Sequence, residues 1–275
     1  MSQKALLYQI ATLTVALVCT TGIASAARNE QDNQGTNSAC GSLPGYTALK
    51  NALIAATSAE TSGLNNQMWG TIVDRDGVVC AVAFTGANRG AQWPGSRVIS
   101  AQKANTANSF SLDSSSYSNG SGQPNGLALS TANLYSAVQP GGSLFGLQES
   151  NPVDTGVAYQ GPSSQYGAAQ DPMTGSKIGG VNVFGGGLAL YATGKQIVGA
   201  VGVSGDTSCA DHDIAWQVRH ALGLDHMSGV GGVSGDAARP DNIIYDITGG
   251  VSAGGYGHPK CANTANPSTL PAVVP

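Results

Sequence analysis

Residues 197–205 read IVGAVGVSG and decide the fold of this chain. Their β-branched side chains predict a strand over residues 196–203. A second strand is expected at 187–192, because the short TGK segment at 193–195 can join the two as a tight hairpin. A helix with an apolar face and an acidic first turn follows at 210–224. This part of the chain is therefore expected to form two strands of a sheet, with the helix packed on one face of that sheet.

Upstream segments complete the predicted sheet. Residues 68–73 and 78–84 are rich in β-branched and aromatic side chains, and the DRDG turn at 74–77 contains the Asp-Gly pair typical of hairpins. A further short strand at 180–184 brings the number of expected strands to five. Apolar spacing and the scarcity of breakers predict the other helices, at 46–62, 96–110 and 127–138.

Two polar insertions interrupt this pattern. The first, near 111–126, is dense in Ser, Asn and Gly, and the second, near 151–177, has no clear periodicity. The compact domain is expected to span residues 40–228. A polar segment at 27–39 precedes it, and a Gly- and Pro-rich extension at 229–275 follows it.

Charged residues are scarce in this chain. They make up 10% of the 275 residues, and the formal net charge is -4, with 12 Lys and Arg against 16 Asp and Glu. An average soluble domain carries about 25% charged residues, so Ser, Thr, Asn, Gln and Gly must form much of this surface. Too few cations remain to neutralise phosphates, which argues against nucleic acid and anionic membranes as partners.

Residues 1–26 have the organisation of a secretory signal peptide. Lys4 supplies the positive start, residues 5–23 form a long apolar run, and ASA at 24–26 is a small-x-small cleavage site. A membrane anchor is the alternative, because the apolar run approaches the ~20 residues that span a bilayer. Cys19 suggests a lipoprotein, but the preceding valine is unsuited to lipidation. We expect a secreted or periplasmic protein with no membrane span after processing.

The order of these elements and several short strings resemble the GlcG/HbpS-like haem-binding (haem-degrading) domain family. The strings include AQKA at 101–104, PGGSLFGL at 140–147 and the strand at 197–205, and the resemblance covers about residues 46–227. It implies an α/β fold with a central antiparallel sheet flanked by helices, here with five strands. It also implies haem or a related tetrapyrrole as the ligand, and assembly into a homo-oligomer. No axial ligand of the family transfers to a residue of this chain.

Four cysteines remain after the leader, namely Cys40, Cys80, Cys209 and Cys261. An even number in an exported chain favours two disulfides over free thiols or a metal site. Topology favours Cys40 with Cys80, because a first helix that packs across the sheet begins beside the first hairpin. Cys209 and Cys261 are then left for each other. The second bond is expected to order the C-terminal extension, which otherwise has little to hold it.

Histidines and one tyrosine are the candidate haem ligands. At about 100° per residue, His212 and His220 point away from the apolar face of the predicted closing helix, so we expect them to meet a ligand, a subunit or solvent. His212 is the first candidate, because a helix N-terminus disfavours the imidazolium and keeps a neutral ring available. Tyr46 could supply a phenolate, with packing on the sheet as the alternative. His258 is expected in a loop.

Signatures of enzymes are mostly absent. The GVSGD string at 202–206 lacks the final glycine of a G-x-S-x-G nucleophile elbow. Asp206, Asp211, Asp213 and His212 form the densest polar cluster, which suits a capped helix start or a metal-dependent reaction.

We therefore predict an exported protein that binds haem or a related tetrapyrrole and sequesters or senses it. A non-enzymatic binding protein is favoured over an enzyme. The alternatives are a haem-degrading or metal-dependent enzyme, and a secreted interaction module that has lost the ligand.

Overall fold

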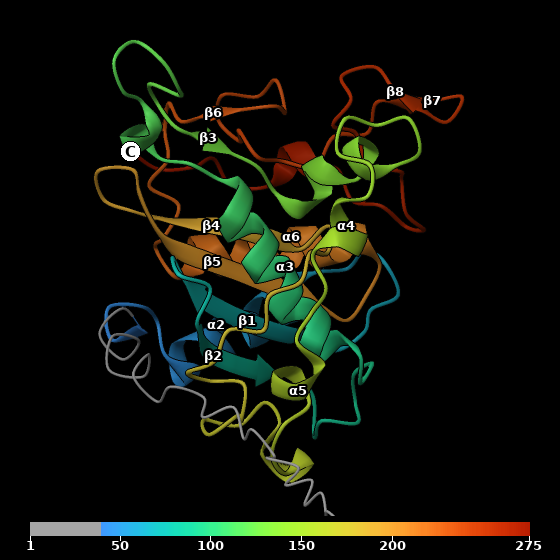
Figure 1. The fold of residues 1–275 in the computed structure, drawn as a ribbon. Helices are drawn as coiled ribbons and strands as arrows, with labels where there is room; N and C mark the ends of the chain where they lie inside the picture. The colour runs from blue at the N-terminus through green and yellow to red at the C-terminus, as the bar shows by residue number, and fades with distance from the viewer. Residues whose placement is uncertain (1–39) are drawn as a thin grey trace, which may run out of the picture. The chain divides into compact units, whose positions relative to one another are not determined.

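The computed structural model describes residues 40–275, and their core is a four-stranded antiparallel sheet (Figure 1). The predicted leader at 1–26 and the polar segment at 27–39 lie outside the described residues. The strand order is β2-β1-β5-β4, with β1 at Trp69–Asp74, β2 at Val79–Phe84, β4 at Gly187–Ala192 and β5 at Gln196–Ser204.

Helices cover both faces of the sheet. α3 (Ser96–Phe110) packs on one face, whereas α2 (Tyr46–Ala59) and α6 (Ser208–Ala221) pack against each other on the opposite face (Figure 1). Within residues 40–275, no helix is long and apolar enough to cross a membrane. The other elements are short: η2 (Ser114–Ser116), β3 (Leu127–Ala128), η3 (Thr131–Leu134), η4 (Ser136–Val138), α4 (Leu147–Ser150), α5 (Thr155–Ala158), η5 (Ser163–Gln165), β6 (Gly231–Gly232), β7 (Ile247–Thr248), β8 (Val251–Ser252) and η6 (Pro267–Thr269).

The sheet has four strands and not the five that the sequence predicts. Residues 180–184 are irregular, because side chains of α3 take the backbone groups that a sheet partner would need. Asn105 Nδ2 donates to the Gly180 carbonyl at 2.8 Å, and the Asn182 amide donates to Thr106 Oγ1 at 3.0 Å. The segment therefore follows α3 and joins no ladder.

The prediction of a helix at 127–138 is also wrong. Residues 127 and 128 form β3, which pairs in parallel with β6, and two 3₁₀ turns follow. Ser130 begins a new turn, because its side chain and that of Asn133 form a reciprocal capping box. The cap interrupts the helical pattern where the apolar spacing alone would continue it.

Two glycines allow α3 to touch the sheet with its backbone. Gly202 of β5 pairs with Gly187 of β4, so the two lie side by side beneath the helix. A Cβ at Gly202 would lie 1.9 Å from the Ser100 carbonyl oxygen, and one at Gly187 would lie 2.4 Å from the Lys103 carbonyl oxygen. Neither position can hold a side chain without moving α3, so the glycines fix the distance between helix and sheet.

A buried ion pair connects the layers at the end of β5. Lys103 Nζ of α3 lies 2.7 Å from Asp211 Oδ2 of α6 and donates to the Val203 carbonyl at 3.0 Å. Gly186 leaves the space for this pair, since a Cβ there would lie 3.1 Å from Lys103 Nζ. Burial lowers the pKa of Lys103 and raises the pKa of Asp211 to about 6, and the attraction between the two opposes both shifts.

The second polar insertion packs on the α3 face beside β1 and β2. Arg97 of α3 donates to Asp171 Oδ2 at 2.8 Å and to the Ala158 carbonyl at 2.7 Å, and both charged side chains are buried. The guanidinium also lies 3.6 Å from the ring centroid of Tyr166. Met173 is fully buried in the same apolar cluster as Trp69. The insertion therefore completes the core of this face.

The structure confirms both predicted disulfides. Cys40 is bonded to Cys80, with the two Cα atoms 5.2 Å apart, and Cys209 is bonded to Cys261, with the Cα atoms 6.0 Å apart. The first bond joins the segment before α2 to β2, which is the placement that the predicted topology requires.

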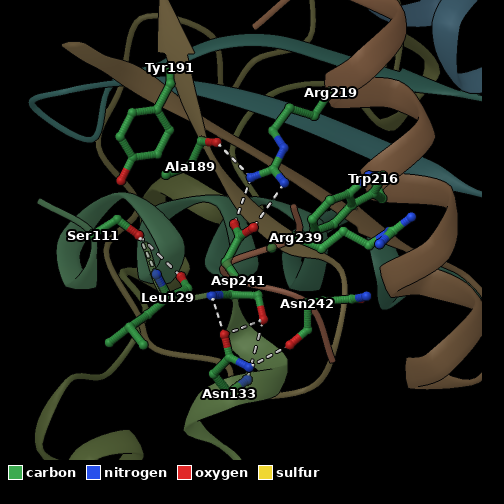
Figure 2. Close-up of polar contacts among 12 residues, drawn as sticks. Ser111, Leu129, Asn133, Ala189, Tyr191, Trp216, Arg219, Arg239, Asp241 and Asn242 are labelled. Atoms are coloured by element: carbon green, nitrogen blue, oxygen red, sulfur yellow. Dashed lines mark hydrogen bonds and ion pairs between the residues drawn. The ribbon is translucent and has the colours of Figure 1, made fainter. Parts of the chain in front are cut away.

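The C-terminal extension has a second attachment besides its disulfide. Arg219 Nη1 and Nη2 of α6 lie 2.6 and 2.9 Å from the two carboxylate oxygens of Asp241, and neither side chain is exposed (Figure 2). Arg219 also donates to the Ala189 carbonyl of β4 at 3.3 Å, and Trp216 Nε1 donates to the Pro271 carbonyl at 3.0 Å. The expectation that little besides Cys261 holds this extension is therefore wrong.

The extension also buries His212, which the helical projection places on an outward face. His212 has no exposed surface, and its Nε2 lies 3.2 Å from both the Ile243 amide nitrogen and Asn242 Oδ1. The predicted orientation is wrong because residues 241–243 cover this face of α6. Burial lowers the pKa of His212 to about 4, although the Asp241 charge acts in the opposite direction.

A methyl group at Gly202 should push α3 off the sheet. We expect Gly202→Ala to lower the free energy of unfolding by about 3 kcal/mol, the upper end of the usual cost of overpacking, in urea denaturation. Gly95→Ala is the matched control, because Gly95 has helical dihedral angles and open space around its Cβ position. Equal stability of the two variants would contradict the backbone contact.

Burial of His212 should make the protein less stable in acid. Between pH 6.5 and about 4 the unfolded chain binds a proton at His212 that the folded protein excludes, so the free energy of unfolding falls as the pH drops. The shift corresponds to about 3 kcal/mol. Urea denaturation should therefore show that the free energy of unfolding of the wild type falls between pH 7 and pH 4. In His212→Gln this fall should be smaller by about 3 kcal/mol. His226→Gln, at the surface, should follow the wild type, and parallel curves for all three proteins would rule out the buried imidazole.

Candidate functional site

The three candidate haem ligands do not form one site. Tyr46 begins α2, His212 is the fifth residue of α6, and His220 lies in the last turn of α6. No hydrogen bond or ring contact within residues 40–275 joins any two of these side chains. The side chain of His212 is sealed beneath the C-terminal extension, so an iron atom could reach it only if that segment moved.

His220 and Tyr46 are both accessible, and each has one partner. His220 has a side chain that is 42% exposed, and its Nδ1 lies 2.7 Å from Oδ2 of the buried Asp225. A carboxylate on one ring nitrogen directs the other outward, as in many ligating histidines. Tyr46 is partly buried against the core, and its hydroxyl accepts a hydrogen bond from Lys50 Nζ at 3.1 Å.

The acidic cluster at the start of α6 is divided among structural contacts. Asp206 accepts hydrogen bonds from the Leu64 and Asn66 amides at 2.7 and 2.8 Å. Asp211 is held by the buried lysine of α3 and accepts from the Asp206 amide at 2.9 Å. Burial, followed by the negative charge of Glu60, raises the pKa of Asp213 to about 7. Asp206 and Asp211 therefore hold the loops around the start of α6, whereas the helix is capped by Thr207, whose side chain accepts a hydrogen bond from the Ala210 amide at 3.3 Å.

A large cavity lies between two glycine-rich segments. We name it the hairpin groove: it has a volume of about 730 Å³ and is lined on one side by residues 135–143 and on the other by the β7–β8 hairpin and Pro259. Its apolar surface includes Ile247 and Val251, and Val251 is 69% exposed. One wall contains the PGG string at 140–142 that carries part of the family resemblance.

His258 lies behind the hairpin groove. It lines an adjacent cavity of about 290 Å³ with Lys260, and this cavity shares Ile247 and Pro259 with the groove. The imidazole is 3% exposed, and its ring centroid lies 5.0 Å from that of Tyr135, which lines the groove. Burial lowers the pKa of His258.

Neither the groove nor the burial of His258 beside it was predicted from the sequence. His258 is in irregular structure, as expected for a loop, but it is buried by contacts distant in sequence. The nearest signal in the sequence is that His258 precedes a disulfide cysteine, Cys261, by three residues. The groove has a weaker signal, since its walls are two glycine-rich strings about 110 residues apart along the chain.

Comparison with known proteins identifies the family. A family model described as haem degrading protein HbpS-like matches residues 47–219, well over half of the chain. The chain matches no curated protein.

Several solved structures are similar to this chain at low identity. A PduOC:heme complex is 21% identical over 64% of this chain and 89% of that chain, with a TM-score of 0.41. The protein ORFY of Klebsiella pneumoniae is 24% identical over 65% and 90%, with a TM-score of 0.41. A double mutant of HbpS from Streptomyces reticuli is 16% identical over 64% and 83%, with a TM-score of 0.38. On the match of the family model, this chain belongs to the HbpS-like family.

Proposed function

We propose that this protein binds haem or a related tetrapyrrole in the hairpin groove, and that it is exported and sequesters or senses this ligand. The observation that carries the proposal is the groove itself, because its volume of about 730 Å³ lies within the range of small-molecule sites, about 300–1,000 Å³. The family description names haem, and one wall of the groove, residues 135–143, lies within the segment that the family model matches. Two disulfides suit an oxidising compartment outside the cytosol.

The residues of the groove fit a tetrapyrrole. Ile247, Val251 and Pro140 offer apolar surface to a flat macrocycle. Tyr135 offers a phenol oxygen, which receives no hydrogen bond from residues 40–275, and tyrosine is an axial ligand in some haem proteins. Lys260 in the adjacent cavity offers a cation for a propionate. The bound iron would supply the absorbance and any redox chemistry, while these side chains would bind and orient the macrocycle.

His220 at the end of α6 is the competing ligand. Its exposed imidazole is oriented by Asp225, which suits iron ligation near the surface. His220 does not line the groove. Substitution of Tyr135 and substitution of His220 therefore distinguish a site in the groove from a site at the end of α6. Tyr46 and His212 remain predicted ligands of lower rank. The Tyr46 hydroxyl already accepts a hydrogen bond from Lys50, and the C-terminal extension covers the His212 side chain.

Titration with haemin tests the proposal. The wild type should give a saturable Soret band, and Tyr135→Phe should shift the band and weaken binding at least about tenfold, since even outer-sphere changes at metal sites cost about 10–100-fold. Tyr117→Phe, an exposed tyrosine of the first insertion, is the matched control and should bind normally.

Two other results would overturn this assignment. Loss of the band in His220→Ala, with normal binding by Tyr135→Phe, would move the ligand to the end of α6. No saturable band in the wild type would favour an interaction module without a ligand. Loss of the band after addition of reductant and oxygen would instead identify a haem-degrading enzyme.

A further inference from the structure

The second disulfide and a buried histidine form a compact set of soft ligands. The sulfur atoms of Cys209 and Cys261 and a ring nitrogen of His258 all lie within 4.8 Å of one another. Cys209 has no exposed surface and His258 is 3% exposed. The set lies behind the hairpin groove and uses none of the residues assigned to haem binding.

The tautomer of His258 is fixed by its hydrogen bonds. Its Nδ1 lies 2.7 Å from the Pro259 carbonyl oxygen, which can only accept, so Nδ1 carries the hydrogen. Nε2 is then an acceptor, and it lies 3.0 Å from the hydroxyl of Ser208, which donates to it. A backbone carbonyl that fixes the tautomer of a histidine is typical of metal-ligating imidazoles.

The frame around these ligands does not depend on the disulfide. Cys209 belongs to the first turn of α6, where the helix dipole favours a thiolate. The segment with His258 is tied back by the His258 amide, which donates to the Ile244 carbonyl at 2.7 Å. The buried pair of Arg219 and Asp241 anchors the same extension to α6. Reduction should therefore leave the two sulfurs and the imidazole near one another.

We propose that reduction of the Cys209–Cys261 disulfide creates a binding site for Zn²⁺ or a similar thiophilic divalent cation, with both thiolates and His258 Nε2 as ligands. Two equivalents of a low-molecular-weight thiol reduce the bond, which yields two protein thiols and one disulfide of the reductant. The cation then displaces the two thiol protons and binds three protein ligands. Such a Cys₂His set suits zinc and leaves one position open for water or the Ser208 hydroxyl.

The other disulfide provides an internal comparison. Cys40, Cys80 and a carboxylate oxygen of Asp74 also lie within 4.8 Å of one another. Asp74 Oδ1 accepts hydrogen bonds from the Asp76 and Val78 amides at 3.0 and 2.9 Å and so holds the first hairpin turn, which leaves only Oδ2 without a hydrogen bond. An imidazole is also a better match than a carboxylate for a cation that prefers thiolates. We assign the site to the second disulfide.

Cobalt binding tests the proposal, because Co²⁺ in a tetrahedral thiolate site gives charge-transfer and visible bands that Zn²⁺ then removes. The protein is Cys40→Ser/Cys80→Ser, which leaves the second disulfide as the only cysteine pair of the described chain. After reduction by a phosphine, it should bind one Co²⁺ with these bands, and the oxidised protein should not.

His258→Ala should weaken Co²⁺ binding at least about tenfold, the lower limit for changes around a metal site, while His226→Ala should not. Circular dichroism of each reduced protein reports whether the fold persists. Equal binding by the oxidised and reduced proteins, no bands after reduction, or binding that His258→Ala leaves unchanged would each overturn the proposal. Unchanged binding by His258→Ala would mean that the two thiols bind the metal ion without the imidazole.

Discussion

The contact between the backbone of α3 and the paired glycines of β4 and β5 is the constraint on which the rest of the structure depends. Because Gly187 and Gly202 have no side chains, α3 packs close enough to the sheet for the Lys103 side chain to contact α6 on the other face. Its partner, Asp211, lies in the first turn of α6 on the opposite face. The position of α3 therefore sets the position of the helix start that carries Cys209 and His212.

Buried ion pairs attach the segments that surround this core. Arg97 and Asp171 hold the second insertion, Lys103 and Asp211 join α3 to α6, and Arg219 and Asp241 hold the C-terminal extension. Such pairs add little net stability, but the loss of one partner leaves an uncompensated buried charge and costs about 3–5 kcal/mol. Substitution of any one of these six charged residues is therefore expected to be strongly destabilising. A chain with only 10% charged residues thus places several of its charges in the interior.

Local patterns predicted the parts of the fold that local forces determine. The hairpin of β4 and β5, the helix at 96–110 and both cysteine pairings follow from apolar spacing, turn residues and topology. The strand expected at 180–184 fails because Asn105 and Thr106 bind its backbone, a contact with no signal in the segment itself. The orientation of His212 fails for a similar reason, since a helical projection cannot show that residues 241–243 will cover the face.

The candidate sites were hardest to predict because they form where the extension meets the family domain. The family match ends at residue 219, yet one wall of the hairpin groove comes from residues 247–259. His258 and Cys261 also belong to the extension, while Ser208 and Cys209 belong to the matched segment. A ligand in this region therefore meets a surface that only the docked extension completes. Because Asp241 docks it through Arg219, the shape of the hairpin groove depends on a segment outside the residues that the family model matches.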